Sequence, residues 1–137
     1  MAFDPLKFST LAFELVEPKK QPQEEHVRTS CGRAYYSAFL VARERLAKIG
    51  KSWGGFGSGI GVHGFVISTL KGSADGAVSG FGQDLSDLFD KRKSADYDLT
   101  SRYGFIQAFG ALVAAGADIW IQDFKKIPDA QLKAACP

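Results

Sequence analysis

Hydrophobic and polar residues follow the period of an α-helix along most of this chain. The clearest stretch is residues 22–49, where apolar positions recur every three or four residues before Gly50. Pro22 and the first-turn acids Glu24 and Glu25 are typical of a helix start. The apolar positions are Val27, Cys31, Ala34, Tyr35, Ala38, Ala42, Leu46 and Ile49. We predict one long helix here.

Four further segments show helical spacing and are separated by turn-forming residues. They are residues 4–17, 62–70, 81–99 and about 102–124. The first begins with Asp4 as N-cap and Pro5 at the first helical position, and Pro18 ends it. Glycine-rich segments at 51–61 and 71–80 predict loops. Because no useful stretch alternates with a period of two, we predict an all-α bundle of four to five helices.

The last predicted helix, about 102–124, is apolar on two faces. One stripe comprises Tyr103, Ile106, Gly110, Val113, Ala117, Trp120 and Phe124, and the second Phe105, Phe109, Leu112, Gly116 and Ile119. Such a helix is expected to be buried both against its own domain and against a partner. We predict a single domain over residues 1–137, with its core at 5–124 and a frayed tail at 125–137.

Composition and charge narrow the possible functions. The 137 residues are 45% hydrophobic and 23% charged, which is typical of a globular chain. A net charge of +2 argues against general nucleic-acid binding and still allows a local basic patch. Cys31 and Cys136 lack metal-ligand spacing, and the start MAFDPLKF lacks a signal-peptide pattern. Gln107 and Asp118 interrupt the most apolar stretch. We therefore expect a cytoplasmic protein without membrane, metal or cofactor.

Two apparent motifs lack the context that their chemistry needs. GIGVHG, residues 59–64, matches the dinucleotide-binding pattern, but a helix and a loop precede it where a strand is required. His26 and His63 form no metal set and lie near no nucleophile pattern. For His63 we favour a structural role, in which it caps or orients the short helix at 62–70.

One charged residue continues an apolar stripe. Arg92 follows Phe81, Leu85 and Leu88 at helical spacing, and Asp96 lies one turn further on. In one interpretation the two residues form an intrahelical ion pair at the edge of the core. In the other, Arg92 lies in a cleft between helices or subunits, where its guanidinium suits a phosphate. Lys91, Lys93 and Arg102 would add to its positive potential. Spacing alone slightly favours the first interpretation.

Three segments together resemble HEPN-domain proteins of the small single-domain prokaryotic type. They are GRAYYSAFLVARERL at 32–46, VHGFVISTL at 62–70 and LFDKRKSADYDL at 88–99. Their order and separation also agree, so the resemblance spans roughly residues 5–124. It implies a helical bundle with a long antiparallel helix pair that commonly mediates dimerisation. Many members are ribonucleases of toxin–antitoxin, CRISPR-linked or other antiviral systems.

The family's catalytic signature is an arginine followed, after four to six residues, by a histidine. In this chain Tyr97 stands where the pattern from Arg92 could place the histidine, and no histidine follows. A tyrosine with an unperturbed pKa of ~10 is a poor proton acceptor at neutral pH. The departure puts cleavage in doubt but leaves binding possible. Asp96 is expected to orient Arg92 or to pair with Arg33, and Tyr97 to pack rather than to stack on a base. Tyr35 is expected to be mainly structural.

Three functions remain as expectations. The first, which we favour, is a dimeric HEPN-type nucleotide- or RNA-binding module of a defence or toxin–antitoxin system. Its binding residues would be Arg92, Lys91, Lys93, Arg102 and Arg33. The second is a metal-independent endoribonuclease that uses Arg92, Asp96 and Tyr97, and the third is a non-catalytic dimerisation or adaptor domain. Expected partners are a second copy, RNA or a nucleotide, and a nucleotidyltransferase-type antitoxin or other defence protein.

Overall fold

A computed structural model describes residues 3–100 and 104–137, and within these ranges the regular structure is helical throughout. The α-helices are α1 (Leu6–Leu15), α2 (Glu24–Lys48), α3 (Val62–Lys71), α4 (Gly76–Tyr97), α5 (Gln107–Lys125) and α6 (Asp129–Ala135). Single 3₁₀ turns occur at Pro18–Lys20 and Phe56–Ser58. The predicted all-α bundle is confirmed, with six α-helices in the described residues rather than four to five.

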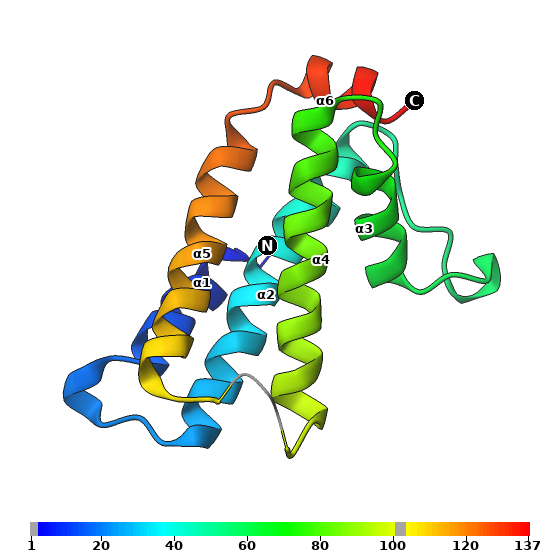
Figure 1. Ribbon diagram of the computed structural model, residues 1–137. Coiled ribbons are helices and arrows are strands. Elements are labelled where there is room, and N and C mark those ends of the chain that lie inside the picture. Colours follow the sequence, from blue (N-terminus) through cyan, green and yellow to red (C-terminus); the bar gives the residue numbers. More distant parts are fainter. Residues whose placement is uncertain (1–2, 101–103) are drawn as a thin grey trace.

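Helix α2 is the centre of the bundle. Helices α1, α4 and α5 pack along it, and α3 packs against α4 (Figure 1). Small side chains such as Ala34, Ala38 and Ala42 are fully buried on α2 and allow this close approach. Helix α4 runs antiparallel to α2, whereas α4 and α5 contact each other only sparsely (Figure 1). The bundle therefore leaves a furrow between α4 and α5.

The predicted frayed tail at 125–137 is wrong. Arg45 on α2 donates hydrogen bonds of 2.6 Å to the carbonyl oxygens of Phe124 and Ile127, and its guanidinium lies 2.9 Å from Asp129 Oδ1. The apolar residues of the tail are buried, namely Ile127, Leu132, Ala135 and Cys136. Their burial and the three contacts of Arg45 hold α6 against the body of the protein, which explains why the segment does not fray.

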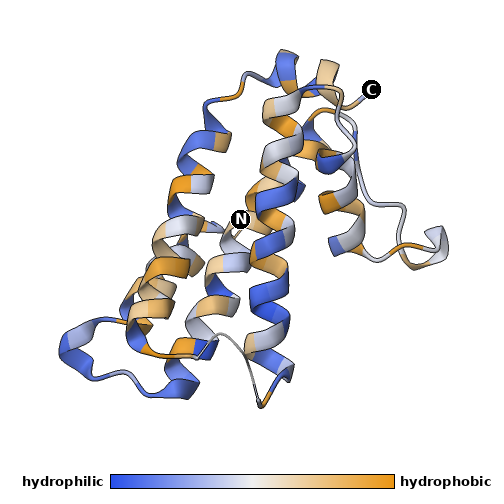
Figure 2. Ribbon diagram, viewed as in Figure 1, coloured by the Kyte–Doolittle hydropathy of each residue, from blue (hydrophilic) through white to orange (hydrophobic). Residues whose placement is uncertain are grey.

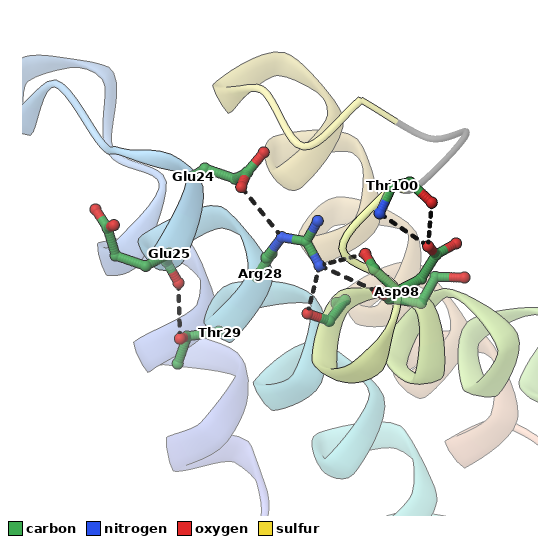
Figure 3. A network of polar contacts seen from close by, with 8 residues as sticks. Glu24, Glu25, Arg28, Thr29, Asp98 and Thr100 are labelled. Carbon is green, nitrogen blue, oxygen red and sulfur yellow. Dashed lines mark hydrogen bonds and ion pairs between the residues drawn. The ribbon is translucent and has the colours of Figure 1, made fainter.

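Arg28 on α2 closes the C-terminal end of α4 (Figure 3). Its Nη1 atom donates to the carbonyl oxygens of Ser94, Ala95 and Asp98 at 3.2, 2.9 and 2.9 Å. The last carbonyls of a helix have no partner within the helix, so a guanidinium in this position satisfies them. Arg28 also lies 3.5 Å from Glu24 Oε2 on the solvent side. Arg28 thereby holds the N-terminal end of α2 against the C-terminal end of α4.

The two apolar stripes predicted for the last helix differ in burial within α5, whereas just before α5 Phe105 of the second stripe is 5% exposed and Ile106 of the first is 65% exposed. Helix α5 begins at Gln107 rather than near residue 102, and Gly104 before it has a positive φ of 59°. The stripe that includes Gly110, Val113, Ala117, Trp120 and Phe124 faces the core. In the second stripe, Leu112 and Ile119 are 72% and 61% exposed. Tyr103 and Arg102 lie outside the described residues.

None of the helices in residues 3–100 and 104–137 is both long enough and apolar enough to cross a bilayer. This includes α5, in which polar residues interrupt the apolar run.

Candidate functional site

Arg92 lies on the side of α4 that faces α2. Its Nε atom is 2.9 Å from Asp96 Oδ2 on the same helix, and its Nη2 atom donates to the Tyr36 hydroxyl at 3.1 Å. The Arg92 side chain is only 16% exposed. Asp96 lies over Gly32 of α2, where a Cβ atom would be 3.9 Å from Asp96 Oδ1. The intrahelical Arg–Asp pair is therefore present, and α2 supplies its surroundings.

Two guanidinium groups flank the ring of Tyr36. The Arg92 Cζ atom lies 5.2 Å from the ring centroid, and the Arg33 Cζ atom lies at the same distance. Arg33 is also 4.9 Å from the ring centroid of Phe8 on α1. A guanidinium over an aromatic face is held by the ring quadrupole as well as by packing. Arg33, Tyr36, Arg92, Asp96 and Tyr97 are called the arginine–tyrosine patch below.

The arginines of this patch differ in how their donors are used. Among the described residues, Asp96 forms its ion pair with Arg92 and none with Arg33. The Nε atoms of Arg33 and Arg92 are both buried and have no hydrogen-bond partner in the described structure, although Arg92 Nε lies 2.9 Å from Asp96 Oδ2. A buried donor without an acceptor is costly, so an incoming anion that reaches such an N–H gains a hydrogen bond that the protein lacks. Asp96 therefore pairs with Arg92, and each guanidinium keeps an Nε donor without an acceptor.

Tyr97 does not pack as expected. Its ring is 74% exposed and lies 5.9 Å from the Arg92 Cζ atom. Tyr97 is the last residue of α4. An exposed aromatic ring next to a guanidinium is suited to stacking with a nucleobase.

The basic residues predicted around Arg92 separate in the structure. Lys93 is exposed, lies 3.4 Å from Asp90 Oδ1 and has its Nζ atom 4.6 Å from the Phe89 ring centroid. Lys91 lines the furrow between α4 and α5, so it does not share the direction of Arg92. Arg102 lies outside the described residues. Adjacent positions on a helix point about 100° apart, which explains why neighbours in sequence do not form one cluster.

His63 is the member of this region that sequence reasoning missed. Its Nδ1 atom lies 2.7 Å from the hydroxyl of Tyr35, which is completely buried. Burial raises the pKa of Tyr35, so its hydroxyl keeps the proton at neutral pH and shares a hydrogen bond with His63. The His63 ring is 5.7 Å from the Tyr36 ring, which in turn binds Arg92. The adjacent tyrosines have different partners, since the hydroxyl of Tyr35 contacts His63 and that of Tyr36 contacts Arg92. Only the tertiary structure shows these partners.

The surroundings keep His63 neutral. It stacks on Phe89 at 5.2 Å and lies 4.3 Å from Phe39, measured between ring centroids. Burial in this aromatic box lowers its pKa, and the positive charges of Arg92 and Arg43 lower it further. The expected structural role of His63 agrees with this geometry, since the hydrogen bond anchors α3 to α2.

Lowering the pH from about 8 to about 5 is expected to destabilise the fold in part through His63. The unfolded chain has an ordinary histidine pKa of about 6.5. In the folded chain the pKa of His63 is lower. The unfolded chain therefore takes up a proton more readily, and acid favours unfolding. The measurement is the free energy of unfolding against pH for wild type, His63→Gln and the control His26→Gln. His63→Gln should reduce the pH dependence below about pH 7, and His26→Gln should leave the His63 contribution in place. Equal slopes for wild type and His63→Gln would contradict the assignment.

No metal centre is evident in the part of the chain that the structure describes. There, no three His, Cys, Asp or Glu side chains are grouped so that they could hold an ion. Cys31 and Cys136 are both buried as free thiols, and burial raises the pKa of Cys31 to about 12. Its thiol is therefore protonated at neutral pH and unsuited to nucleophilic chemistry.

A scan against protein-family models, a search of curated proteins and a search of solved structures each returned no match to this chain.

Proposed function

We propose that the arginine–tyrosine patch binds the phosphate and base of single-stranded RNA or of a nucleotide. The observation that carries the proposal is a pair of guanidinium groups, each 5.2 Å from the ring centroid of Tyr36 and each with a buried Nε atom that has no hydrogen-bond partner in the described structure. A guanidinium offers planar donors that match phosphate oxygens. The exposed ring of Tyr97 beside Arg92 supplies a stacking surface for a base.

The charge of the patch sets the expected strength of binding. Arg33 and Arg92 bring two positive charges, and Asp96 brings one negative charge at 2.9 Å from Arg92. Asp96 fixes the guanidinium and also weakens its attraction for an anion. Binding through so few phosphate contacts should be modest at low salt and should decrease further as salt is raised.

The biological setting of this proposal rests on the resemblance to HEPN-domain proteins at residues 32–46, 62–70 and 88–99. We propose a dimeric RNA- or nucleotide-binding module of a defence or toxin–antitoxin system. Two copies would bring two patches to one RNA strand, which increases the effective affinity of each. Endoribonuclease activity is the second candidate. It is supported by His63, which lies next to Tyr36, the residue that binds Arg92, but the His63 Nδ1 atom is already engaged in a hydrogen bond with Tyr35.

The test is RNA binding by the purified protein and by matched charge variants. A short fluorescent single-stranded RNA is titrated at about 50 mM and about 200 mM salt, and its anisotropy is measured. Arg92→Gln and Arg33→Gln should each weaken binding by about tenfold at low salt, because each loses one phosphate contact. Lys133→Gln removes one exposed charge from α6 and should change affinity less than twofold. Equal losses in all three variants would overturn the proposal.

Further readouts separate the candidate functions. Arg92→Lys keeps the charge but loses the planar donors, so it should bind less well than wild type while circular dichroism shows an intact helical fold. Cleavage on a denaturing gel that disappears in Arg92→Gln would favour the endoribonuclease. Absence of any RNA interaction, with an oligomeric mass that changes in Arg92→Gln, would favour the adaptor domain and exclude RNA binding at this patch.

A further inference from the structure

The furrow between α4 and α5 is an apolar groove with an acidic rim. Its volume is about 280 Å³, and its floor is formed by Phe81, Leu88, Ile119 and Trp120. Around this groove, Figure 2 shows hydrophilic and hydrophobic positions mixed on both α4 and α5. Ile119 is 61% exposed, although it belongs to an apolar stripe of α5. Exposed apolar surface inside a groove is typical of a binding site for another protein.

The groove is held open by its own contacts. Trp120 on α5 donates its indole N–H to the carbonyl oxygen of Phe81 on α4 at 3.0 Å. The two rings also meet edge to face, with their centroids 5.6 Å apart. Gly116, one turn before Trp120, has no side chain to fill the space, and a Cβ atom there would meet nothing within 4 Å. The groove therefore exists before any partner arrives.

The rim of the groove carries an excess of negative charge. Asp84 and Asp87 on α4 and Asp123 on α5 line it, together with the single cation Lys91. Asp87 accepts a hydrogen bond from Gln83 at 3.1 Å, and Asp123 lies 3.5 Å from the exposed Lys126. Asp84 has no ion pair with any residue that the structure describes. Three carboxylates against one ammonium attract a partner of opposite charge.

We propose that this groove binds an amphipathic helix of a partner protein with an apolar stripe and flanking lysines or arginines. The apolar stripe of the partner helix would cover the floor of the groove, including Ile119. Its basic side chains would reach Asp84, Asp87 and Asp123. A second copy of this chain suits the groove poorly. A twofold interface places the same surface on both sides, so the carboxylates of one copy would face those of the other.

This binding is separate from the RNA binding proposed above. Arg92 points from α4 toward Tyr36 on α2, whereas Asp87 and Lys91 point into the groove. The two proposals can therefore fail or succeed independently, and variants of the groove leave every residue of the arginine–tyrosine patch in place.

Trp120 serves as the reporter for the test. The chain has two tryptophans, and Trp53→Phe leaves Trp120, in the groove, as the only tryptophan of the chain. The full chain with this substitution is titrated with a roughly 18-residue helical peptide that has a leucine stripe and lysines elsewhere. A peptide with glutamates in place of the lysines is the matched probe. The lysine peptide should shift Trp120 emission saturably, and the glutamate peptide should bind at least tenfold more weakly.

Two variants in the Trp53→Phe background identify the groove as the site. Neutralising the rim with Asp84→Asn, Asp87→Asn and Asp123→Asn together should weaken the lysine peptide by about tenfold at low salt. Ile119→Asp should remove the Trp120 response. The control Glu14→Gln, Glu25→Gln and Glu44→Gln removes three carboxylates outside the groove and should stay within twofold of its parent.

Three results would overturn the proposal. The first is no response of Trp120 to the lysine peptide, and the second is equal binding of both peptides. The third is dimerisation of the protein in the absence of peptide. The mass would double as protein concentration rises, Trp120 emission would shift at the same time, and Ile119→Asp would abolish both changes. That result would assign the groove to a second copy of this chain.

Discussion

Replacing Gly82 with alanine is expected to lower the free energy of unfolding by about 2–3 kcal/mol. Gly82 is buried in α4 where the last turn of α3 crosses it. A Cβ atom at this position would meet the backbone nitrogen of Lys71, and it would lie 2.8 Å from the carbonyl carbon of Leu70. Because these neighbours are backbone atoms, no side-chain rotation can relieve the clash. Helices α3 and α4 must separate instead.

Gly80 provides the control for this prediction. It lies in the same helix two residues earlier, but a Cβ atom there would meet nothing within 4 Å. Gly80→Ala is therefore expected to stabilise the protein by about 0.5–1 kcal/mol through helix propensity. Urea unfolding followed by circular dichroism measures both variants. The same sign of change for Gly80→Ala and Gly82→Ala would contradict the close contact between α3 and α4.

Replacing Arg28 with methionine is expected to destabilise the protein by about 3 kcal/mol. The side chain is 15% exposed and donates to three carbonyl oxygens at the end of α4, as Figure 3 shows. Methionine retains much of the volume but has no donor, so the carbonyls of Ala95 and Asp98 lose the guanidinium, whereas the Ser94 carbonyl keeps its hydrogen bond from the Asp98 N–H at 3.0 Å. The cation also leaves the ring of Phe105, whose centroid is 4.3 Å from the Arg28 Cζ atom.

Glu24→Gln separates the carbonyl contacts of Arg28 from its surface ion pair. Glu24 is 67% exposed and lies 3.5 Å from the Arg28 Nε atom. Removing its charge is expected to change stability by less than about 0.5 kcal/mol. Thermal unfolding of Arg28→Met, Glu24→Gln and wild type provides the comparison. A loss in Glu24→Gln as large as that in Arg28→Met would show that the ion pair, and not the helix end, is the source of stability.

The local pattern of residues was sufficient to predict five of the helices, but it was wrong on residues 76–80, which it assigned to a loop and which form the first turn of α4, and it missed α6. The long helix predicted at 22–49 is observed as α2 at Glu24–Lys48, with Gly50 after it at φ +88°. The prediction succeeded because helix starts, stops and apolar periodicity depend on residues within a few positions of each other. The predicted all-α class followed from the same local signals.

The tail and the last helix show where this local information ends. Leu132 and its neighbours were predicted to fray, because the binding partner of that segment, Arg45, lies more than 80 positions earlier. The burial of one stripe of α5 and the exposure of the other depend on where α2 and α1 lie, because α5 packs mainly against these two helices. Neither feature is encoded within the segment itself.

For the candidate site, the sequence by itself determined that Arg92 and Asp96 meet, because a spacing of four places them on one side of a helix. Only the tertiary structure decided that Arg33 and Arg92 share Tyr36, that His63 joins them through Tyr35 and Tyr36, and that Tyr97 is exposed. Contacts between helices depend on the crossing of elements that are distant in the chain. The apolar stripe and its period were therefore local properties, whereas the groove beside α5 arises only when α2, α4 and α5 pack together.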